Sequence, residues 1–595
     1  MPALRVGLVL DSLTPPRWVR RVVEQIQASS YARIVVVVVD EPVRRSGRRR
    51  HTAWGRELLY QLYTRLDDRL FGRPGDALDR CSITNLLSGV PVLASPVLES
   101  ECGGWPPAMR ARLLECSLDV VLALGRRPAD SEARGLARYG VWFLHHGHDL
   151  ATAGAPPGFW EVLEGHRATG SLLAVTGCGA PVPRIVSRSY APTDNRSVRR
   201  NRNNYYWKTA DFLLRKLDEV HSDPSSGLAE VFEPAPTTMP ARYRRAPTNA
   251  EMTRLLGSLA RRYLVEKLAH VIWLDQWFVA VSADGRTDTG TSEARRFTYL
   301  LPPADRYWAD PFPITHNGRQ YIFLEEFLLG RGKAHIAVST IQPDGRPTRP
   351  VTVLDRPYHL SYPFVFTWRD TYYMMPETGR NRTVELYRAS SFPFEWELDR
   401  VLLDNINAAD ATLVEIQGTW WLFVNVAVDG SGNADELHLF SAPEPIGPWL
   451  PHVRNPVKSD ARSARPAGRI LTVGDAYYRP SQDCSGRYGR AVVLNQIVSL
   501  DHAHYVEREV GKIEPEPAGG LLGTHTLNQC GQFVCLDGVL RASRFRVWRK
   551  GARLATGVAA LNGDHLSAAR VRAAGRSAIG FWASGQAASV LGSRS

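Results

Sequence analysis

The sequence of 595 residues has few cysteines. Its seven cysteines are scattered, with no CxxC pair and no Cys/His cluster. This arrangement argues against a disulfide framework and a structural zinc site, and it favours a reducing, cytoplasmic compartment. We therefore predict no metal site.

Long apolar runs and nucleotide-binding motifs are also missing. No run of about 18 apolar residues occurs, so no transmembrane helix is expected. The first ten residues lack a basic region followed by a long apolar run, and they predict a β-strand rather than a signal peptide. GxGxxG and GxxxxGK[ST] are absent, which leaves a dinucleotide or P-loop site without support.

The net charge of +13 comes with arginines spread along the whole chain, so we expect no nucleic-acid partner. Two stretches are richer in arginine, residues 44–50 and 199–207. We expect the first in a loop after the second strand and the second just before a helix that ends near His221. Either could hold a phosphate-bearing substrate or contact an anionic membrane, and either could be a solvated loop.

The chain is too long for one hydrophobic core, and its composition, 44% hydrophobic and 22% charged, is that of a globular protein. We expect a multidomain protein, with an α/β domain joined to an all-β domain. The expected boundaries are an α/β domain over 1–221, a linker and helix over 222–270, a β-propeller over 271–541, and a basic, poorly ordered tail over 542–595.

The first domain alternates strands and helices. Apolar runs predict buried strands at 4–10, 34–39, 119–124 and 141–145, and helices are expected at 16–28, 107–116 and 130–138. Repeated strand–helix–strand units indicate a doubly wound sheet. His145, His146, His148 and Asp149 follow the last of these strands, where open parallel sheets bind ligands. The alternative is a polar strand end in a loop.

The order of this strand, FWEVLEG and TGSLLAV resembles the formyltransferase domain of methionyl-tRNA and sugar N-formyltransferases, over about residues 1–220. The resemblance places the family's histidine on His145 and its asparagine on Phe143. Thr176 and Gly177 stand where the family has an aspartate. The resemblance therefore implies a degenerate formyltransferase-like site. Formyl-tetrahydrofolate is expected as a cofactor only if the protein is instead an active sugar N-formyltransferase; otherwise the cofactor is unknown.

The second half carries a repeat of about 50 residues. Strand, turn and aromatic-rich strand recur from residues 308, 361, 409, 465 and 525. Five four-stranded units at this period predict a five-bladed β-propeller. The fifth unit is short, and residues 277–281, ahead of the first unit, could supply its outer strand and close the ring.

The first strand of each blade lines a propeller's channel, so its leading residues should converge. In the five units these residues are Asp310, Tyr362, Asp410, Arg465 and His525. Charged groups gathered in this way need water, pairing or a ligand. We expect Arg465 to hold an anionic group of the ligand or to pair with Asp410.

The repeat resembles the propeller of family-43 glycoside hydrolases. The resemblance implies that Asp310 is a general base and that Asp410 orients the acid. Arg465 stands where that family has its general acid, and a guanidinium cannot donate a proton at neutral pH. Glu377 is a candidate replacement acid, or a surface partner of Arg380 or Arg382. Asp310 and Asp410 could otherwise cap turns at the strand starts.

Residues 270–540 also resemble the propeller that precedes the glycosyltransferase domain of plant glucosamine inositolphosphorylceramide transferases. The shared motifs are RYWADPFP, YMMPETGRNRTVELYRA, ARPAG, YYRPSQDCSGRYG and GTHTLN. Arg479 and Asp483, in the fourth motif, could bind substrate or form a structural ion pair. In those proteins the propeller accompanies glycan assembly.

We therefore expect a carbohydrate-active enzyme of glycan or glycolipid biosynthesis, most simply a transferase. A sugar, nucleotide-sugar or glycolipid substrate would bind in the propeller channel. Alternatives are a folate-dependent sugar N-formyltransferase with a glycan-binding propeller and a non-catalytic glycan-binding scaffold. The oligomeric state is left open.

Overall fold

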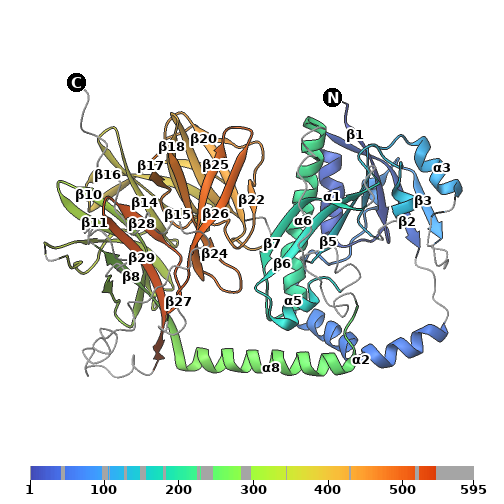
Figure 1. Ribbon diagram of the computed structural model, residues 1–595, viewed down its shortest axis with the longest axis horizontal. Coiled ribbons are helices and arrows are strands. Elements are labelled where there is room, and N and C mark those ends of the chain that lie inside the picture. The colour runs from blue at the N-terminus through green and yellow to red at the C-terminus, as the bar shows by residue number, and fades with distance from the viewer. Residues whose placement is uncertain are drawn as a thin grey trace. The chain divides into compact units, whose positions relative to one another are not determined.

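The computed structural model describes residues 2–41, 47–96, 105, 107–125, 130–147, 156–177, 182–223, 228, 245–282, 297–343, 345–427, 430–515 and 521–544. His148, Asp149 and all but the first three residues of the expected tail lie outside this set. The chain forms two compact units, Met1–Tyr263 with Val428–Gly432 and Leu264–Ala427 with Asn433–Ser595 (Figure 1). Among the described helices, none is both long and apolar enough to cross a membrane.

The first unit is built on one seven-stranded sheet with the strand order β3-β2-β1-β4-β5-β6-β7. The strands are β1 (Leu4–Leu10), β2 (Ala32–Glu41), β3 (Val92–Pro96), β4 (Val120–Ala123), β5 (Val141–His146), β6 (Ala168–Thr176) and β7 (Arg184–Pro192). The first five run parallel, as their buried apolar sequences require. The last two pair antiparallel, so the sheet is mixed rather than wholly parallel.

Helices accompany this sheet along the chain. They are α1 (Arg17–Ala28), α2 (Gly47–Phe71), α3 (Pro107–Glu115), α4 (Asp130–Ala133), α5 (Phe159–Glu164), α6 (Val198–Ser222) and α8 (Asn249–Ile272), with a 3-10 turn η1 (Thr84–Leu87). The buried face of α1, including Val19, Val22 and Val23, joins one core with the sheet residues Val6 and Leu8. The four predicted strands are present, and so are the helices predicted at 16–28 and 107–116, whereas the helix predicted at 130–138 ends at Ala133.

The two arginine-rich stretches differ from their predicted positions. Helix α6 begins at Val198, so residues 199–207 lie inside the helix rather than ahead of it. The Ser197 hydroxyl accepts from the Arg200 N–H and caps the N-terminus of this helix. A serine directly before residue 198 is a sequence signal for a helix start there. Residues 47–50 likewise belong to α2 rather than to a loop.

The second unit is a five-bladed β-propeller. Blade one holds β10 (Arg306–His316), β11 (Arg319–Leu328), β12 (Lys333–Thr340) and β13 (Val351–Leu354). Blade two holds β14 (Ser361–Trp368), β15 (Thr371–Thr378), β16 (Thr383–Ser391) and β17 (Glu395–Asp404), with a 3-10 turn η4 (Gly379–Asn381) between β15 and β16. Blade three holds β18 (Ala408–Ile416), β19 (Thr419–Val426), β20 (Glu436–Ala442), β21 (Leu450–Pro451) and β22 (Lys458–Ser459).

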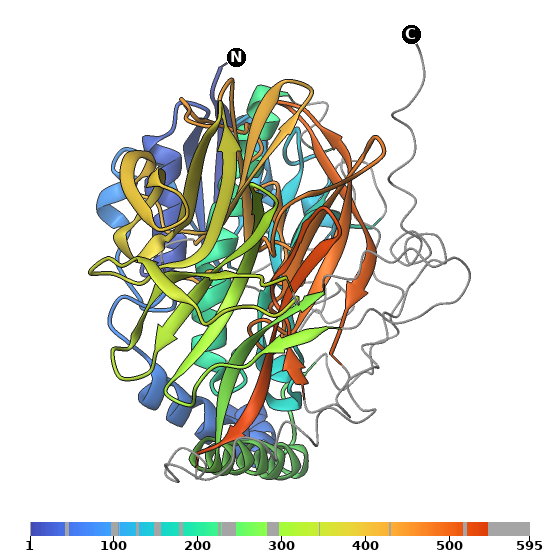
Figure 2. The same ribbon diagram turned by 90° about the vertical axis from the view of Figure 1, so that its left-hand side faces the viewer.

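Blade four holds β23 (Leu471–Val473), β24 (Ala476–Asp483), β25 (Ala491–Leu500) and β26 (Tyr505–Ile513). Blade five joins both ends of the propeller sequence: β27 (Leu521–Gly523), β28 (Leu527–Cys530) and β29 (Phe533–Ser543) pair with β8 (Trp273–Ser282) and β9 (Thr298–Leu300). Strand β8 pairs with β29 from Trp273 opposite Ser543 to Ser282 opposite Val534, and Figure 2 shows the green and red strands side by side. The predicted strand at 277–281 is confirmed as a member of the fifth blade, but β9 rather than β8 is its outermost strand. The pairing of β8 with β29 joins the two ends of the propeller sequence and covers the edge of β29.

Candidate functional site

The innermost strands of the first three blades repeat one strained feature. Asp310, Tyr362 and Asp410 have positive φ angles of 50°, 47° and 55°. At each of these residues the pairing with the next strand shifts register, as in a β-bulge. A left-handed conformation is costly for a residue with a side chain, above all for tyrosine, and such strain tends to be kept at functional sites.

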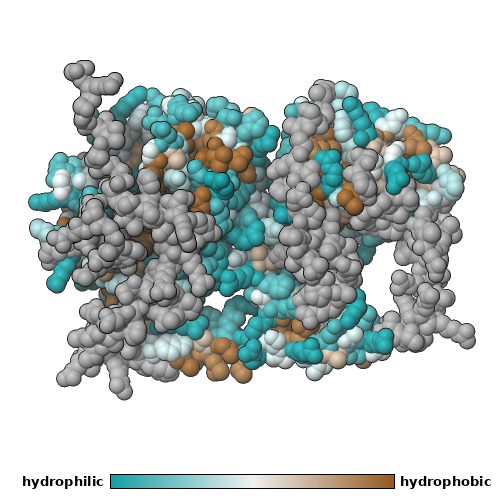
Figure 3. Space-filling model, viewed as in Figure 1, coloured by the Kyte–Doolittle hydropathy of each residue, from teal (hydrophilic) through white to brown (hydrophobic). Residues whose placement is uncertain are grey.

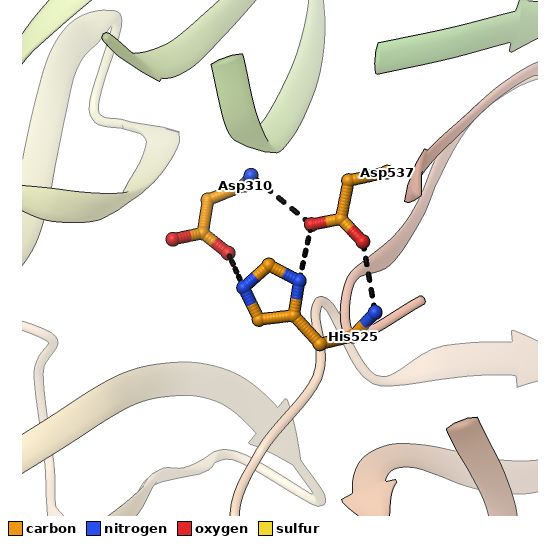
Figure 4. A group of neighbouring side chains, drawn as sticks. All are labelled: Asp310, His525 and Asp537. Carbon is orange, nitrogen blue, oxygen red and sulfur yellow. Dashed lines mark hydrogen bonds and ion pairs between the residues drawn. The ribbon is translucent and has the colours of Figure 1, made fainter. Parts of the chain in front are cut away.

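The bulge directs Asp310 toward the fifth blade, where it meets His525 and Asp537 (Figure 4). His525 Nε2 lies 3.4 Å from Asp310 Oδ1, and its Nδ1 lies 2.6 Å from Asp537 Oδ2. All three residues are buried. The cation of a protonated His525 therefore compensates the negative charges of two buried carboxylates.

These three side chains could also lend ligand atoms to a cation, because one nitrogen or oxygen from each lies within 4.8 Å of the others. In this structure the same atoms pair with one another. Asp310 accepts further hydrogen bonds from the Thr526 hydroxyl at 2.6 Å and from the Tyr362 N–H at 3.1 Å.

A second charged group joins blades two, three and four. Arg465 donates from Nε to Asp410 Oδ2 at 2.5 Å and from Nη2 to Glu377 Oε2 at 3.2 Å. Gln482 on β24 donates to Asp410 Oδ2 at 2.6 Å. The guanidinium also lies 5.1 Å from the ring centre of Tyr488. Of the two roles expected for Arg465, the structure shows the pairing with Asp410. We call Asp310, Glu377, Asp410, Arg465, Gln482, His525 and Asp537 the channel cluster.

Tyr362 ties the inner strands together. Its hydroxyl lies 2.8 Å from the Thr412 hydroxyl on blade three and accepts from the Gly468 N–H on blade four at 2.6 Å. The side chain is fully buried and packs against Phe312 on blade one. Tyr362 therefore sits among the expected channel residues, with its hydroxyl already engaged by the protein.

Burial and neighbouring charges shift the acidities of the channel cluster. Burial, together with the charge of Asp410, raises the pKa of Asp310 to about 6 and that of Glu377 to about 8. Burial alone would lower the pKa of His525, but the carboxylates of Asp537 and Asp310 raise it to about 9. At neutral pH the site therefore holds a protonated Glu377 and a cationic His525.

The structure places Arg479 and Asp483 outside the channel cluster, in internal ion pairs of blade four. Arg479 is fully buried and donates to both carboxylate oxygens of Glu507, at 2.7 and 2.8 Å. Asp483 accepts from Lys512 at 2.6 Å and also pairs with Arg490. Both residues are on the opposite face of β24 from Gln482, because successive side chains of a strand alternate.

Four residues in or beside the site were not predicted from the sequence: Gln482, Asp537, Tyr488 and Glu325. Asp537 could have been found, because it is the one charged residue in the run FVCLDGVL of β29. Glu325 is buried beside the channel cluster, and burial with the charges of Asp310 and Glu377 raises its pKa well above its usual range. Tyr307 donates to it at 3.4 Å.

Two of the predicted formyltransferase-like site residues, His145 and His146, lie at the end of β5. Both are half-buried, and the His146 ring packs against the rings of Tyr205 and Tyr206, with centroid distances of 4.6 and 4.4 Å. Its Nδ1 lies 3.2 Å from the Ser171 hydroxyl. Burial, with the positive charges of His145 and Arg202, lowers the pKa of His146 to about 3, so its ring is neutral.

The two positions where the formyltransferase resemblance breaks have structural causes. Phe143 is 5% exposed and belongs to the hydrophobic core on one face of the sheet, so an apolar residue fits there. Gly177 has a φ of +86°, and a Cβ at this position would lie 2.4 Å from the Ala133 carbonyl oxygen. No side chain fits there without movement of the backbone.

Residues 302–520, most of the propeller, match the family model described as "Glucosamine inositolphosphorylceramide transferase 1, N-terminal". The chain is 37% identical over 203 residues to glucosamine inositolphosphorylceramide transferase 1 of Oryza sativa subsp. japonica, a match that covers 33% of this chain and 27% of the relative. It is 33% identical over 208 residues to glucosamine inositolphosphorylceramide transferase 1 of Arabidopsis thaliana, a match that covers 34% of this chain and 27% of the relative. The chain thus spans about a quarter of the length of the curated relatives it matches.

Among solved structures, the chain is similar to a thermostable family-43 glycoside hydrolase, with 14% identity and a TM-score of 0.29 over 36% of this chain and 81% of that one. It is also similar to the GH43_1 enzyme from Xanthomonas citri complexed with xylose, with 12% identity and a TM-score of 0.30. That match covers 40% of this chain and 88% of the enzyme's chain. The assignment of five blades rests on the strand pairing of this chain.

Proposed function

We propose that the protein acts in glycolipid biosynthesis as a transferase or transferase component, and that its propeller binds the sugar- and phosphate-bearing headgroup of an inositolphosphorylceramide-type lipid. The observation that carries the proposal is the position of the channel cluster. Asp310, Glu377, Asp410 and Arg465 all lie inside the span 302–520 that matches the N-terminal model of glucosamine inositolphosphorylceramide transferases.

The chemistry of the channel cluster supports binding of such a headgroup over hydrolysis of a glycosidic bond. Hydrolysis by inversion needs one carboxylic acid to protonate the leaving group and a second carboxylate to activate water. The fourth blade offers Arg465 in place of the acid, and Glu377, the candidate replacement acid, is engaged by that guanidinium at 3.2 Å, while Asp410 pairs with it at 2.5 Å. We therefore propose that neutral arabinan and xylan are not cleaved.

Glu377 is the member of the cluster best suited to touch a ligand. Its side chain keeps 16% of its surface exposed, against 6% for Arg465 and 3% for Asp410. With a pKa near 8 its carboxyl is protonated at neutral pH and can both donate and accept hydrogen bonds. Once ionised, it would repel the phosphate of the headgroup.

The pH dependence of binding tests this assignment. We expect calorimetric titration with a soluble inositol phosphate headgroup to give affinity that falls as pH rises through about 8 in the wild type. The Glu377→Gln variant keeps the neutral hydrogen-bonding group, so its affinity should stay level over the same range. A parallel fall in both proteins, or release of pentose from neutral polymers at about 1 per second or faster, would contradict the proposal.

A further inference from the structure

Helix α8 has two apolar stripes, and they lie on opposite sides. In its first half Met252, Leu255 and Leu259 pack into a core cluster with residues of α2 and α5. The Asn249 side chain also accepts from the Leu59 N–H of α2 at 3.0 Å. These contacts fix which side of α8 faces the first unit.

The second stripe, in the last turns of α8, is exposed. Leu264, Val265, Leu268 and Val271 are 59%, 60%, 52% and 66% exposed, and Ile272 is 37% exposed. At about 100° of rotation per residue this stripe lies about 180° around the helix from the packed one. Figure 3 shows hydrophobic side chains gathered at this end of the helix. A continuous exposed apolar stripe marks an interaction surface, unlike scattered exposed residues.

The charges on the outward side are positive. Arg254 and Arg261 are exposed and continue the line of the apolar stripe toward the start of the helix. Of the two glutamates in α8, Glu251 pairs with Arg245, and Glu266 lies on the opposite side, 3.6 Å from His270. Trp273, 39% exposed, follows directly after the stripe. Tryptophan is enriched where protein meets the headgroup region of a bilayer.

Helix α2 repeats this composition. Leu58, Leu62, Leu66 and Leu70 recur at every fourth position and are 41%, 50%, 55% and 65% exposed. Arg65 and Arg69 are exposed on the same side of that helix. Exposed apolar side chains accompanied by arginines thus occur on α2 as well as on α8.

We propose that α8 docks on an anionic lipid bilayer, with its exposed apolar stripe in the headgroup region and Arg254 and Arg261 on lipid phosphates. An amphipathic helix of this kind lies in the plane of the interface, and its affinity combines buried apolar area with attraction to anionic lipid. A second copy of the chain is the less suitable occupant, because it would bring the arginines of two helices together. The proposal does not depend on headgroup binding by the propeller.

Vesicle flotation of the full-length protein tests the docking surface. Vesicles of phosphatidylcholine alone and of phosphatidylcholine with phosphatidylglycerol are compared. The wild type should float with the anionic vesicles, and Leu264→Glu/Leu268→Glu/Val271→Glu should lower the partition coefficient at least tenfold. The matched control is Val401→Glu/Val498→Glu/Val506→Glu, on propeller residues that are 45%, 59% and 52% exposed, and it should bind like the wild type.

Charge is tested separately with Arg254→Ala/Arg261→Ala, which leaves the apolar stripe intact. Each arginine removed should weaken anionic binding about fivefold, the equivalent of about 1 kcal/mol. Added salt should weaken wild-type binding as well. Equal binding to neutral and anionic vesicles, or wild-type binding by the stripe and arginine variants, would overturn the proposal. So would light scattering that shows a dimer broken by the stripe variant, with no vesicle binding.

Discussion

Arg465 links two carboxyl groups of the channel cluster, those of Asp410 and Glu377. It is 5% exposed and stands between two carboxyl groups that come from different blades. A buried pair of this kind contributes little net stability compared with an apolar replacement of both partners, whereas loss of one partner leaves a charge buried without compensation. Replacement of Arg465 alone should therefore lower the free energy of unfolding.

Replacement of Arg465 by methionine should lower the free energy of unfolding by about 3–5 kcal/mol, because Asp410 loses its cation. Urea denaturation measures the loss. The control is Arg487→Met, which breaks the pair with Asp275 at 2.9 Å, where the side chains are 32% and 44% exposed. That change should cost less than about 1 kcal/mol. Similar small losses in both variants would show that Arg465 is not needed to compensate buried charge.

The stability of the propeller should fall with rising pH. The folded-state pKa of His525 is raised to about 9, so its contribution is complete below about 6.5 and is lost as the pH rises through 9. The raised pKa of Glu377, about 8, acts in the same direction between about 4.5 and 8, since its ionisation is disfavoured in the fold. The free energy of unfolding from urea titrations should decrease by a few kcal/mol between about pH 6.5 and 9. A level or rising profile would contradict a cationic His525 and a protonated Glu377 at neutral pH.

Among the contacts between elements, the pairing of β8 with β29 closes the ring of the propeller. Val279 and Val281 on β8 are buried with Trp308 and Ile322 of blade one. The apolar run at 277–281 predicted a strand there, because aromatic and β-branched residues in a short apolar run favour a strand. The antiparallel direction of β6 and β7 was not predictable, since a buried apolar run looks the same in either direction.

Val279→Asp should destabilise the closure by several kcal/mol, because it places a carboxylate in an apolar cluster. The matched control is Leu398→Asp on the outer strand β17, at a residue that is 48% exposed, where a change within about 0.5 kcal/mol is expected. Thermal unfolding compares the two. A melting temperature for Val279→Asp equal to that of the control would show that β8 is dispensable.

The candidate site was predictable only in part for a related reason. Repeat register brings Asp310, Tyr362, Asp410, Arg465 and His525 to equivalent places, and the cross-blade contacts follow from that. Which face of β24 meets the channel depends on how the strand is set in its blade. Sequence alternation alone therefore could not choose Gln482 over its neighbours Arg479 and Asp483.

For the molecule as a whole, the first unit carries an α/β sheet whose formyltransferase resemblance remains a prediction. Phe143 fills the core and Gly177 excludes a side chain, so we expect no folate-dependent formyl transfer. The assay is turnover of formyl-tetrahydrofolate with amino-sugar nucleotides. Turnover that disappears in His145→Ala would show the first unit to be an active formyltransferase.

Binding of a glycolipid headgroup in the propeller channel is the proposal on which the function of the whole molecule depends. A crystal structure of the full-length protein soaked with a soluble sugar-linked inositol phosphate would show the binding site itself. We predict density for the headgroup against Glu377 and its neighbours in the channel cluster, and loss of that density in Glu377→Ala crystals with the cluster otherwise intact. Density only at sites outside the propeller, or unchanged density in the variant, would contradict headgroup binding at this site.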